Sequence, residues 1–252
     1  MTIIYPSPIF GPVHSRRLGI SLGVNLMPSD GKMCTFDCIY CECGFNNDFR
    51  PNLPRPKREE VAKALEEKLI EMQASGKLPD VITFAGNGEP TGHPAFADII
   101  EDTIALRDKY CNKAKVSVLS NSTFIHRESV HAALMKVDNN ILKLDTVDPE
   151  YIKIVDRPTN SYDVKKIIEG MKSFNGHCIV QTMFLHSPQI EIDEKHINDW
   201  LEAIKYIAPS QVMIYTIDRE TPDKSLKKAT RQELDSIKAK VEELGISCSA
   251  SY

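Results

Sequence analysis

Short runs of β-branched and apolar residues alternate along the chain with longer amphipathic stretches, and this alternation restricts the fold more than any other feature. The short runs are typical of buried strands. The longer stretches carry apolar residues at helical spacing, as Val61, Leu65 and Leu69 do. Strands are therefore predicted at residues 21–26, 81–86, 115–122, 140–145, 178–185 and 211–217.

A helix is predicted after each of these strands. The predicted helices cover residues 57–75, the segment that carries Phe96 and Ile104, then 127–137, 161–174 and 193–206, and a last one that begins at Thr230 and ends at Gly245. Parallel neighbouring strands need such long crossovers, which are right-handed. We therefore expect an α/β fold whose parallel sheet forms a barrel or an incomplete barrel, with the chemistry at the carboxyl ends of the strands.

The length of the chain allows a substantial core without disulfides or structural metals. We expect one domain over residues 1–252, with an N-terminal extension at 1–19 and a C-terminal helix and tail at about 230–252. Thr230 and Glu233 have the spacing of a capping box at the start of that helix.

Composition and charge favour a cytoplasmic protein. No window approaches the roughly 20 apolar residues of a membrane span, and the opening MTIIYPSPIFGP lacks the basic region of a signal peptide. Reducing conditions disfavour disulfides, so clustered cysteines indicate metal or redox chemistry. The net charge of −4 argues against a surface built mainly to bind nucleic acid, although a local basic cleft stays open.

The segment CTFDCIYC places Cys34, Cys38 and Cys41 in a C-x3-C-x2-C pattern. Three thiolates can bind three irons of a 4Fe–4S cluster, which normally takes four, and so leave one iron open to another ligand. Two alternatives remain. In the first, Cys43 is near enough in sequence to complete a four-thiolate zinc or closed iron–sulfur site in a non-catalytic module. In the second, the cysteines bind no metal and are inert buried residues.

The cysteine spacing, with Tyr40 before the last cysteine, resembles the radical S-adenosylmethionine (SAM) superfamily. The resemblance implies a partial (β/α)6 parallel barrel in which the amine and carboxylate of SAM chelate the open iron. It also implies reductive cleavage of SAM to a 5′-deoxyadenosyl radical that abstracts hydrogen, and an electron donor such as flavodoxin or ferredoxin. Tyr40 is expected near the adenine.

Two further segments are similar to SAM-binding motifs of that superfamily. FAGNGEPT is similar to the glycine-rich segment that contacts the methionyl amine of SAM, and its glycines allow close backbone approach. The expected binding residues there are Gly86, Asn87, Gly88 and Glu89. At the end of the third predicted strand, Ser120 and Asn121 are expected to bind the ribose, although either residue also suits a helix N-cap.

A closer resemblance links GPVHSRRLG, CTFDCIYC, FAGNGEPT and YTIDRETP to the radical SAM group related to the tRNA-wyosine synthases. Those enzymes modify a guanosine with pyruvate and hold a second cluster by additional cysteines, whereas here Cys43, Cys111, Cys178 and Cys248 are scattered. A Schiff base at Lys143 is one expectation. A structural ion pair with Asp145 is the alternative, because strand alternation places both side chains on one face.

Several basic residues beside these motifs are further candidates for the site. Arg219, next to Asp218 after the last predicted strand, is the foremost candidate for binding an anionic substrate. Arg16, Arg17 and Arg157 are similar candidates, and His14 and His93 are possible acid–base groups. The sequence thus predicts a radical SAM enzyme and leaves RNA-base modification, peptide maturation and activation of a glycyl-radical enzyme open.

Overall fold

The structure is a computed structural model that describes residues 2–15, 19–190 and 192–252. In this part of the chain, eight strands form one sheet in the order β1-β2-β3-β4-β5-β6-β8-β10. Neighbouring strands are parallel except for the antiparallel pair β1 and β2. The strands are β1 (Ile9–Ser15), β2 (Gly19–Val24), β3 (Val81–Phe84), β4 (Lys115–Ser120), β5 (Asn139–Lys143), β6 (Ile179–Met183), β8 (Gln211–Tyr215) and β10 (Cys248–Ser251).

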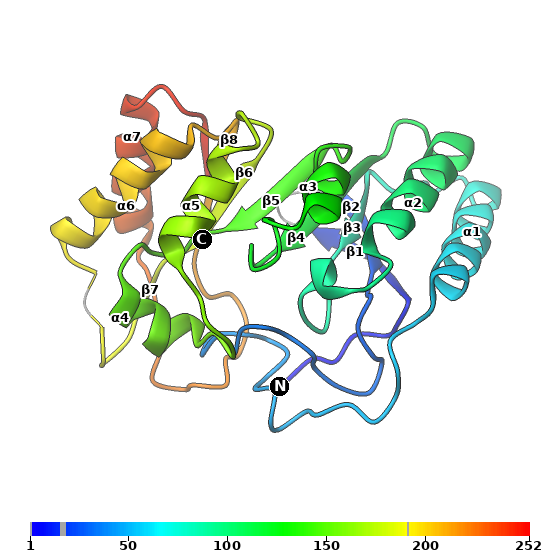
Figure 1. The fold of residues 1–252 in the computed structure, drawn as a ribbon, viewed down its shortest axis with the longest axis horizontal. Helices are drawn as coiled ribbons and strands as arrows, with labels where there is room; N and C mark the ends of the chain where they lie inside the picture. The colour runs from blue at the N-terminus through cyan, green and yellow to red at the C-terminus, as the bar shows by residue number, and fades with distance from the viewer. Residues whose placement is uncertain (1, 16–18, 191) are drawn as a thin grey trace.

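The sheet curls into a half-barrel, and the helices cover its outer face (Figure 1). They are α1 (Arg58–Ala74), α2 (Phe96–Tyr110), α3 (Glu128–Leu134), α5 (Val164–Lys172), α6 (Glu194–Ile207) and α7 (Arg231–Glu243). Shorter elements lie in the connections: η1 (Pro90–Gly92), α4 (Pro149–Tyr151), the π-helix η2 (Ile152–Asp156), and the strand pair β7 (Leu185–His186) and β9 (Lys227–Lys228). The expected α/β partial barrel is confirmed, and the six predicted strands correspond to β2, β3, β4, β5, β6 and β8.

Two strands of the sheet were not predicted from the sequence. β1 contains Gly11 and Pro12, and its register with β2 shifts between Phe10 and Val13. Proline has no N–H to donate, so it occurs on edge strands and at bulges, where the alternating pattern of a strand is lost. β10 is the short run CSAS, which has little β-propensity and is paired only along β8.

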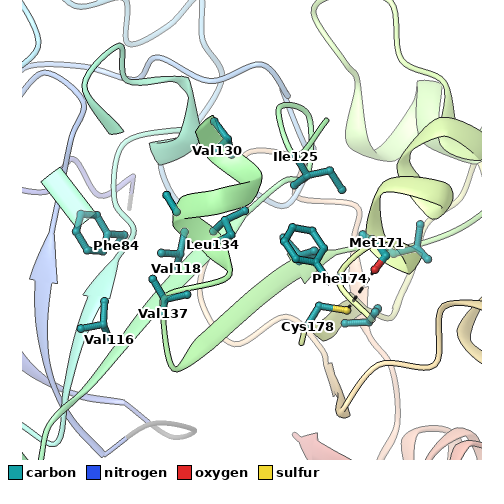
Figure 2. Packing of buried hydrophobic residues seen from close by; sticks show 14 of the residues in the cluster. Phe84, Val116, Val118, Ile125, Val130, Leu134, Val137, Met171, Phe174 and Cys178 are labelled. Carbon is teal, nitrogen blue, oxygen red and sulfur yellow. Dashed lines mark hydrogen bonds between the residues drawn. The ribbon is translucent and has the colours of Figure 1, made fainter. Parts of the chain in front are cut away.

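The hydrophobic core lies between the outer face of the sheet and the helices. Phe84, Val116 and Val118 of the strands pack against Val130 and Leu134 of α3 (Figure 2). Alternation along the strands sends the intervening side chains to the inner face, where Leu119, Ile141, Ile179 and Met213 form a smaller cluster. Among the described residues, none of the helices has the length and apolar character needed to span a membrane.

Candidate functional site

The three predicted ligand cysteines lie on the long loop between β2 and α1. Hydrogen bonds join the backbone of this loop to two other segments. Met33 forms a bridge with Gly88 after β3, and Ile39 N donates to Val155 O of η2 at 2.9 Å. Thr159 N also donates to Thr35 O at 2.9 Å. The cysteine loop is therefore fixed between the ends of β3 and β5, over the carboxyl edge of the sheet.

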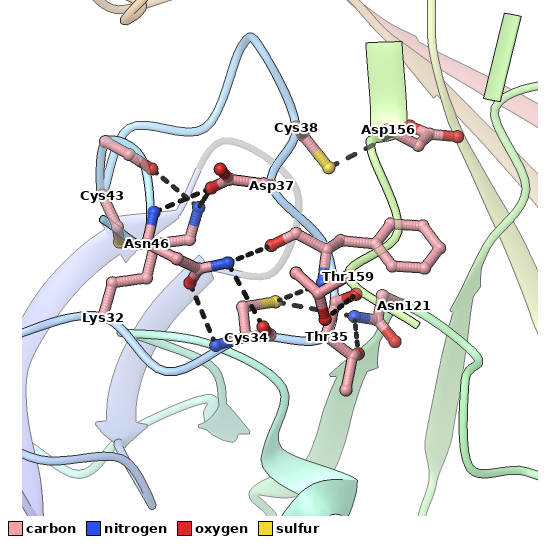
Figure 3. Close-up of polar contacts among 12 residues, drawn as sticks. Lys32, Cys34, Thr35, Asp37, Cys38, Cys43, Asn46, Asn121, Asp156 and Thr159 are labelled. Carbon is pink, nitrogen blue, oxygen red and sulfur yellow. Dashed lines mark hydrogen bonds and ion pairs between the residues drawn. The ribbon is translucent and has the colours of Figure 1, made fainter. Parts of the chain in front are cut away.

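Cys38 is buried, Cys34 and Cys41 are partly buried, and the three thiols interact electrostatically with one another. Cys34 Sγ accepts hydrogen bonds from Phe36 N and from Asn121 Nδ2, both at 3.5 Å (Figure 3). Burial raises the pKa of the Cys34 thiol to about 12 and that of the Cys38 thiol well above its ordinary value. These buried thiols lose their protons readily only with cationic or metal partners.

Cys43 lies beside Cys41 and differs from the other three cysteines of the loop. A hydrogen bond from the Cys43 thiol lowers the pKa of Cys41 to about 6, although burial acts in the opposite direction. The same bond, together with burial, raises the pKa of Cys43 well above its ordinary range. Cys43 Sγ also lies 3.5 Å from Gly86 O.

The donor set of this loop fits an iron–sulfur cluster. Such a cluster is bound by thiolates at separate irons, so its protein ligands do not converge on one point. Within the described ranges, no three His, Cys, Asp or Glu side chains are gathered as ligands of a single metal ion. Cys111, Cys178 and Cys248 are buried elsewhere, and Cys178 lies in the core with its thiol directed at Met171 O (Figure 2).

A polar network of loop side chains, which was not predicted from the sequence, fixes the conformation of the cysteine loop. Lys32 Nζ donates to Asp37 Oδ1 at 3.2 Å and to Gly44 O at 2.6 Å (Figure 3). The Asn46 amide donates to Cys34 O and Phe36 O at 3.3 and 3.1 Å. A lysine and an asparagine in a polar loop carry no pattern in the sequence that would single them out.

The GNGE segment after β3 approaches this loop closely. Gly88 has φ of +150°, and a Cβ added there would lie 1.9 Å from Met33 O. Gly86 has φ of +123°, and an added Cβ would lie 2.8 Å from the side chain of Asn25. Both glycines are therefore required by backbone conformation and by space. Asn87 is fully buried, and its side chain bonds the backbone of Tyr5 and Pro28.

The structure brings Glu89, Ser120 and Asn121 together, as their positions after neighbouring strands predict. Glu89 Oε1 accepts from Ser120 Oγ at 2.9 Å and from Thr91 N at 3.0 Å, and Oε2 accepts from Asn121 N at 2.6 Å. Burial raises the pKa of Glu89, whereas these hydrogen bonds act to lower it. Both oxygens of Glu89 are thus engaged by the chain itself, and Asn121 Nδ2 is directed at Cys34 and at Thr35 Oγ1.

A second buried cluster surrounds Lys143 at the end of β5. Its ammonium forms an ion pair with Asp145, a second one with Asp156 at 2.8 Å, and a hydrogen bond with Tyr40. Burial acts to lower the pKa of Lys143, but Asp145 and Asp156 raise it well above its ordinary value. The alternation argument that placed Lys143 and Asp145 on one face is confirmed, and the ion pair disfavours the neutral amine that a Schiff base requires.

A cavity of about 600 Å³ opens inside the half-barrel next to the cysteine loop. Tyr40, Cys41, Cys43 and Gly86 line it at the loop end. Its other walls come from the inner face of the sheet and from the N-terminal segment, including Ser21, Thr83, Leu119, Ile141, Gln181, Met213 and His14. A space of this size suits a cofactor-sized ligand with a polar end at the loop.

At the mouth of this cavity, Arg219 forms an ion pair with Glu42 and donates to Tyr5 Oη at 3.0 Å. These residues come from three distant segments.

His93 is buried away from the cavity wall, with Nε2 2.9 Å from Pro56 O and Nδ1 accepting from Ala95 N. Arg157 stacks over the ring of Phe45. Arg16 and Arg17 lie outside the described residues.

The profile of the radical SAM superfamily matches residues 29–199, which include the cysteine loop and strands β3 to β6 of the sheet. A UPF0026 protein of Helicobacter pylori is 34% identical over 87% of this chain and 67% of its own length. A Brachyspira hyodysenteriae protein named GTPase Obg is 27% identical over 91% of this chain, which spans 33% of that protein.

Among solved structures, Streptococcus suis SuiB bound to S-adenosylmethionine has a similar fold. It superimposes with a TM-score of 0.63 and 16% identity over 91% of this chain, which covers 50% of SuiB. Because the superfamily profile covers well over half of the sequence, this chain belongs to the radical SAM superfamily.

Proposed function

We propose that this chain binds a 4Fe–4S cluster through Cys34, Cys38 and Cys41 and cleaves SAM reductively. The observation that carries the proposal is the position of the three thiols on one fixed loop, with Cys41 in the wall of a cavity of about 600 Å³. A cluster with one iron free of cysteine supplies the electron that cleaves SAM to a 5′-deoxyadenosyl radical, which abstracts hydrogen from a substrate.

The residues of this chain orient SAM and exclude water in this proposal. Gly86 lines the cavity beside Cys43 and lets a ligand approach the backbone closely. Tyr40 lines the same end of the cavity, and its hydroxyl is anchored by Asp145 and Lys143. The aromatic ring is therefore fixed in place as one wall of the proposed adenine site.

Glu89 supports the ends of β3 and β4 in this proposal. Its two oxygens fix Ser120 and the backbone of Asn121, the residues predicted to bind the ribose. Contact of Glu89 with the methionyl ammonium, and of Ser120 with the ribose, stay predictions. Arg219 is proposed to select an anionic group of the substrate at the cavity mouth, where the group would replace Glu42 as its partner.

The electron donor and the substrate class are also proposed. A one-electron donor such as flavodoxin or ferredoxin is expected. RNA bases, peptides, glycyl-radical enzymes and the guanosine of the wyosine reaction all offer carbon–hydrogen bonds, and the relation to wyosine synthases stays a prediction. A cytoplasmic location is likewise a prediction.

The test is anaerobic reconstitution with iron and sulfide, followed by reduction with dithionite in the presence of SAM. We expect 5′-deoxyadenosine to be detected by chromatography and SAM to perturb the EPR signal of the reduced cluster. Substitution of Cys34 by Ala should abolish both. A reducible cluster that neither responds to SAM nor cleaves it, with candidate substrates present, would contradict the proposal.

A pair of cysteine variants separates this proposal from the closed four-thiolate site. Cys41→Ala should lose most of the cluster iron, whereas Cys43→Ala should retain it, because Cys43 is expected to donate a hydrogen bond and not to ligate. Cys248→Ala, far from the loop in β10, is the control. Equal loss of iron in Cys41→Ala and Cys43→Ala would favour the non-catalytic module.

A further inference from the structure

Lys32 is buried although it carries an ammonium group. Its side chain is 1% exposed, and it lies two residues before Cys34 at the base of the cysteine loop. Removing an ammonium group from water is costly unless partners replace the lost hydration. The burial of Lys32 therefore requires an explanation from its surroundings.

Two acceptors in the cysteine loop bind this ammonium. Nζ lies 3.2 Å from Asp37 Oδ1 and 2.6 Å from Gly44 O (Figure 3). Asp37 Oδ1 is fixed in turn by Asn46 N at 2.8 Å. The ammonium of Lys32 therefore lies within the loop that carries the predicted cluster ligands, between Asp37, which precedes Cys38, and Gly44, which follows Cys43.

Binding of a cluster would change the charge that faces Lys32. One carboxylate, Asp37, forms an ion pair with Lys32, and it also accepts from the backbone. The remaining electrostatic partners are Cys41, Cys34 and Cys38. Iron binds cysteine as thiolate, so binding of a cluster adds negative charge at the positions that face this ammonium.

We propose that Lys32 is the buried countercharge of the iron–sulfur cluster and raises its reduction potential. The inference rests on the proposed function, since it requires a cluster on Cys34, Cys38 and Cys41. Reduction adds an electron, and a fixed positive charge close by stabilises the reduced form more than the oxidised form. Hydrogen bonds to the sulfurs and net charge are among the factors that set cluster potentials.

Asp37 has the opposite effect in this arrangement. Its carboxylate neutralises part of the charge of Lys32. Removing that negative charge should therefore increase the electrostatic effect of the ammonium on the cluster. Two variants at neighbouring positions should therefore shift the potential in opposite directions. A residue that only stabilised the fold would not produce that pattern.

The experiment measures the midpoint potential of the reconstituted protein by EPR-monitored redox titration without SAM. Lys32→Met removes the charge and keeps the length of the side chain, Lys32→Arg keeps the charge, and Asp37→Asn removes the carboxylate. Lys115→Met, at the exposed start of β4, is the control for the same change in net charge. Iron and sulfide per chain are counted for every variant.

We expect Lys32→Met to lower the ratio of reduced to oxidised cluster at least about tenfold at a given potential, a shift of about 59 mV to more negative values for one electron. Asp37→Asn should shift the midpoint to more positive values. Lys32→Arg should stay nearer to wild type than Lys32→Met does, and Lys115→Met should match wild type.

The outcomes separate this inference from the proposed function. If wild type cleaves SAM but Lys32→Met and Asp37→Asn both retain the wild-type midpoint, the countercharge role is wrong and the proposed function stands. If wild type takes up no cluster, the countercharge role and the proposed function both fail. Should Lys32→Met not retain iron, the double variant Lys32→Met/Asp37→Asn decides: a midpoint more negative than that of Asp37→Asn supports the role of Lys32, and an equal or more positive midpoint overturns it.

Discussion

At the scale of single residues, the site depends on buried charges whose partners come from several segments of the chain. Lys143 of β5 lies between Asp145 and Asp156, and Tyr40 of the cysteine loop bonds the same group. The hydroxyl of Tyr151 is buried nearby and has no hydrogen-bond partner among the described residues. This cluster joins the cysteine loop to β5 and η2, so it fixes the loop as well as the cavity wall.

Replacement of Lys143 by Met should destabilise the protein by about 3–5 kcal/mol, because two buried carboxylates lose their common partner. Lys153→Met is the control, since Lys153 is exposed and its pair with Glu150 contributes about 0–1 kcal/mol. Urea denaturation of the two variants measures the difference. A stable Lys143→Met protein that had lost only product formation would restore the Schiff-base expectation.

His93 should make the protein sensitive to mild acid. Burial lowers its pKa, and Ala95 N donates to its Nδ1, so the folded state holds the neutral ring. The unfolded chain therefore binds more protons below the unfolded pKa of about 6.5, and stability falls as pH decreases from there towards the lower folded pKa.

His93→Gln should lose less stability over that interval than wild type. Urea midpoints between about pH 7.5 and 5.5 test this, with His126→Gln as the control because His126 is exposed. Parallel pH profiles for wild type and His93→Gln would show that His93 does not titrate as expected.

At the scale of elements, two connections shape the carboxyl edge of the sheet. The turn after β3 carries Gly86 and Gly88, and the segment after β5 contains the π-helix η2, which places Asp156 against Cys38. π-Helical turns occur frequently at functional sites. Both connections hydrogen-bond the cysteine loop, so the geometry of the proposed ligands depends on segments outside the motif.

Gly88→Ala should therefore be far more damaging than Gly76→Ala. Both glycines have positive φ, but an added Cβ meets Met33 O at 1.9 Å in the first case and nothing within 4 Å in the second. The strain at Gly76 should cost roughly 1–2 kcal/mol. Gly88→Ala should cost more than that and also reduce iron uptake. Urea unfolding and iron content are the measurements, and equal stability of the variants would contradict the close approach.

At the scale of the whole molecule, the two faces of the sheet have different surroundings. The outer face is close-packed under the helices, whereas the inner face borders the cavity of about 600 Å³. Val118 and Leu119 are adjacent in β4 and lie on opposite faces, Val118 against α3 (Figure 2) and Leu119 in the cavity wall. Similar side chains one residue apart are thus expected to differ in role.

Leu119→Trp should change the free energy of unfolding by less than about 1 kcal/mol, because the cavity has room for the indole. It should nevertheless weaken SAM binding at least about tenfold, which equilibrium dialysis of the reconstituted protein measures. Val118→Trp should be destabilised by about 1–3 kcal/mol or more through overpacking. Normal SAM affinity in Leu119→Trp would place the SAM site elsewhere.

The sequence predicted the repeating strands and helices because hydrophobic periodicity is a local property of the chain. It also indicated the cysteine loop, the GNGE turn and the polar residues at the end of β4, since carboxyl ends of parallel strands meet at one edge. β1 and β10 were missed, because a strand broken by Gly11 and Pro12 and a run of four small residues have no clear periodicity.

The sequence by itself determined the fold class and the identity of the three proposed ligand cysteines, whose spacing is short and local. Only the tertiary structure decided which charges face them. Lys32 is paired with Asp37 on the loop itself, whereas Lys143 meets Asp156 of the segment that follows β5 and Arg219 meets Glu42 from the other end of the chain. Electrostatic partnership depends on distance and burial in space, and no local pattern in a sequence encodes either.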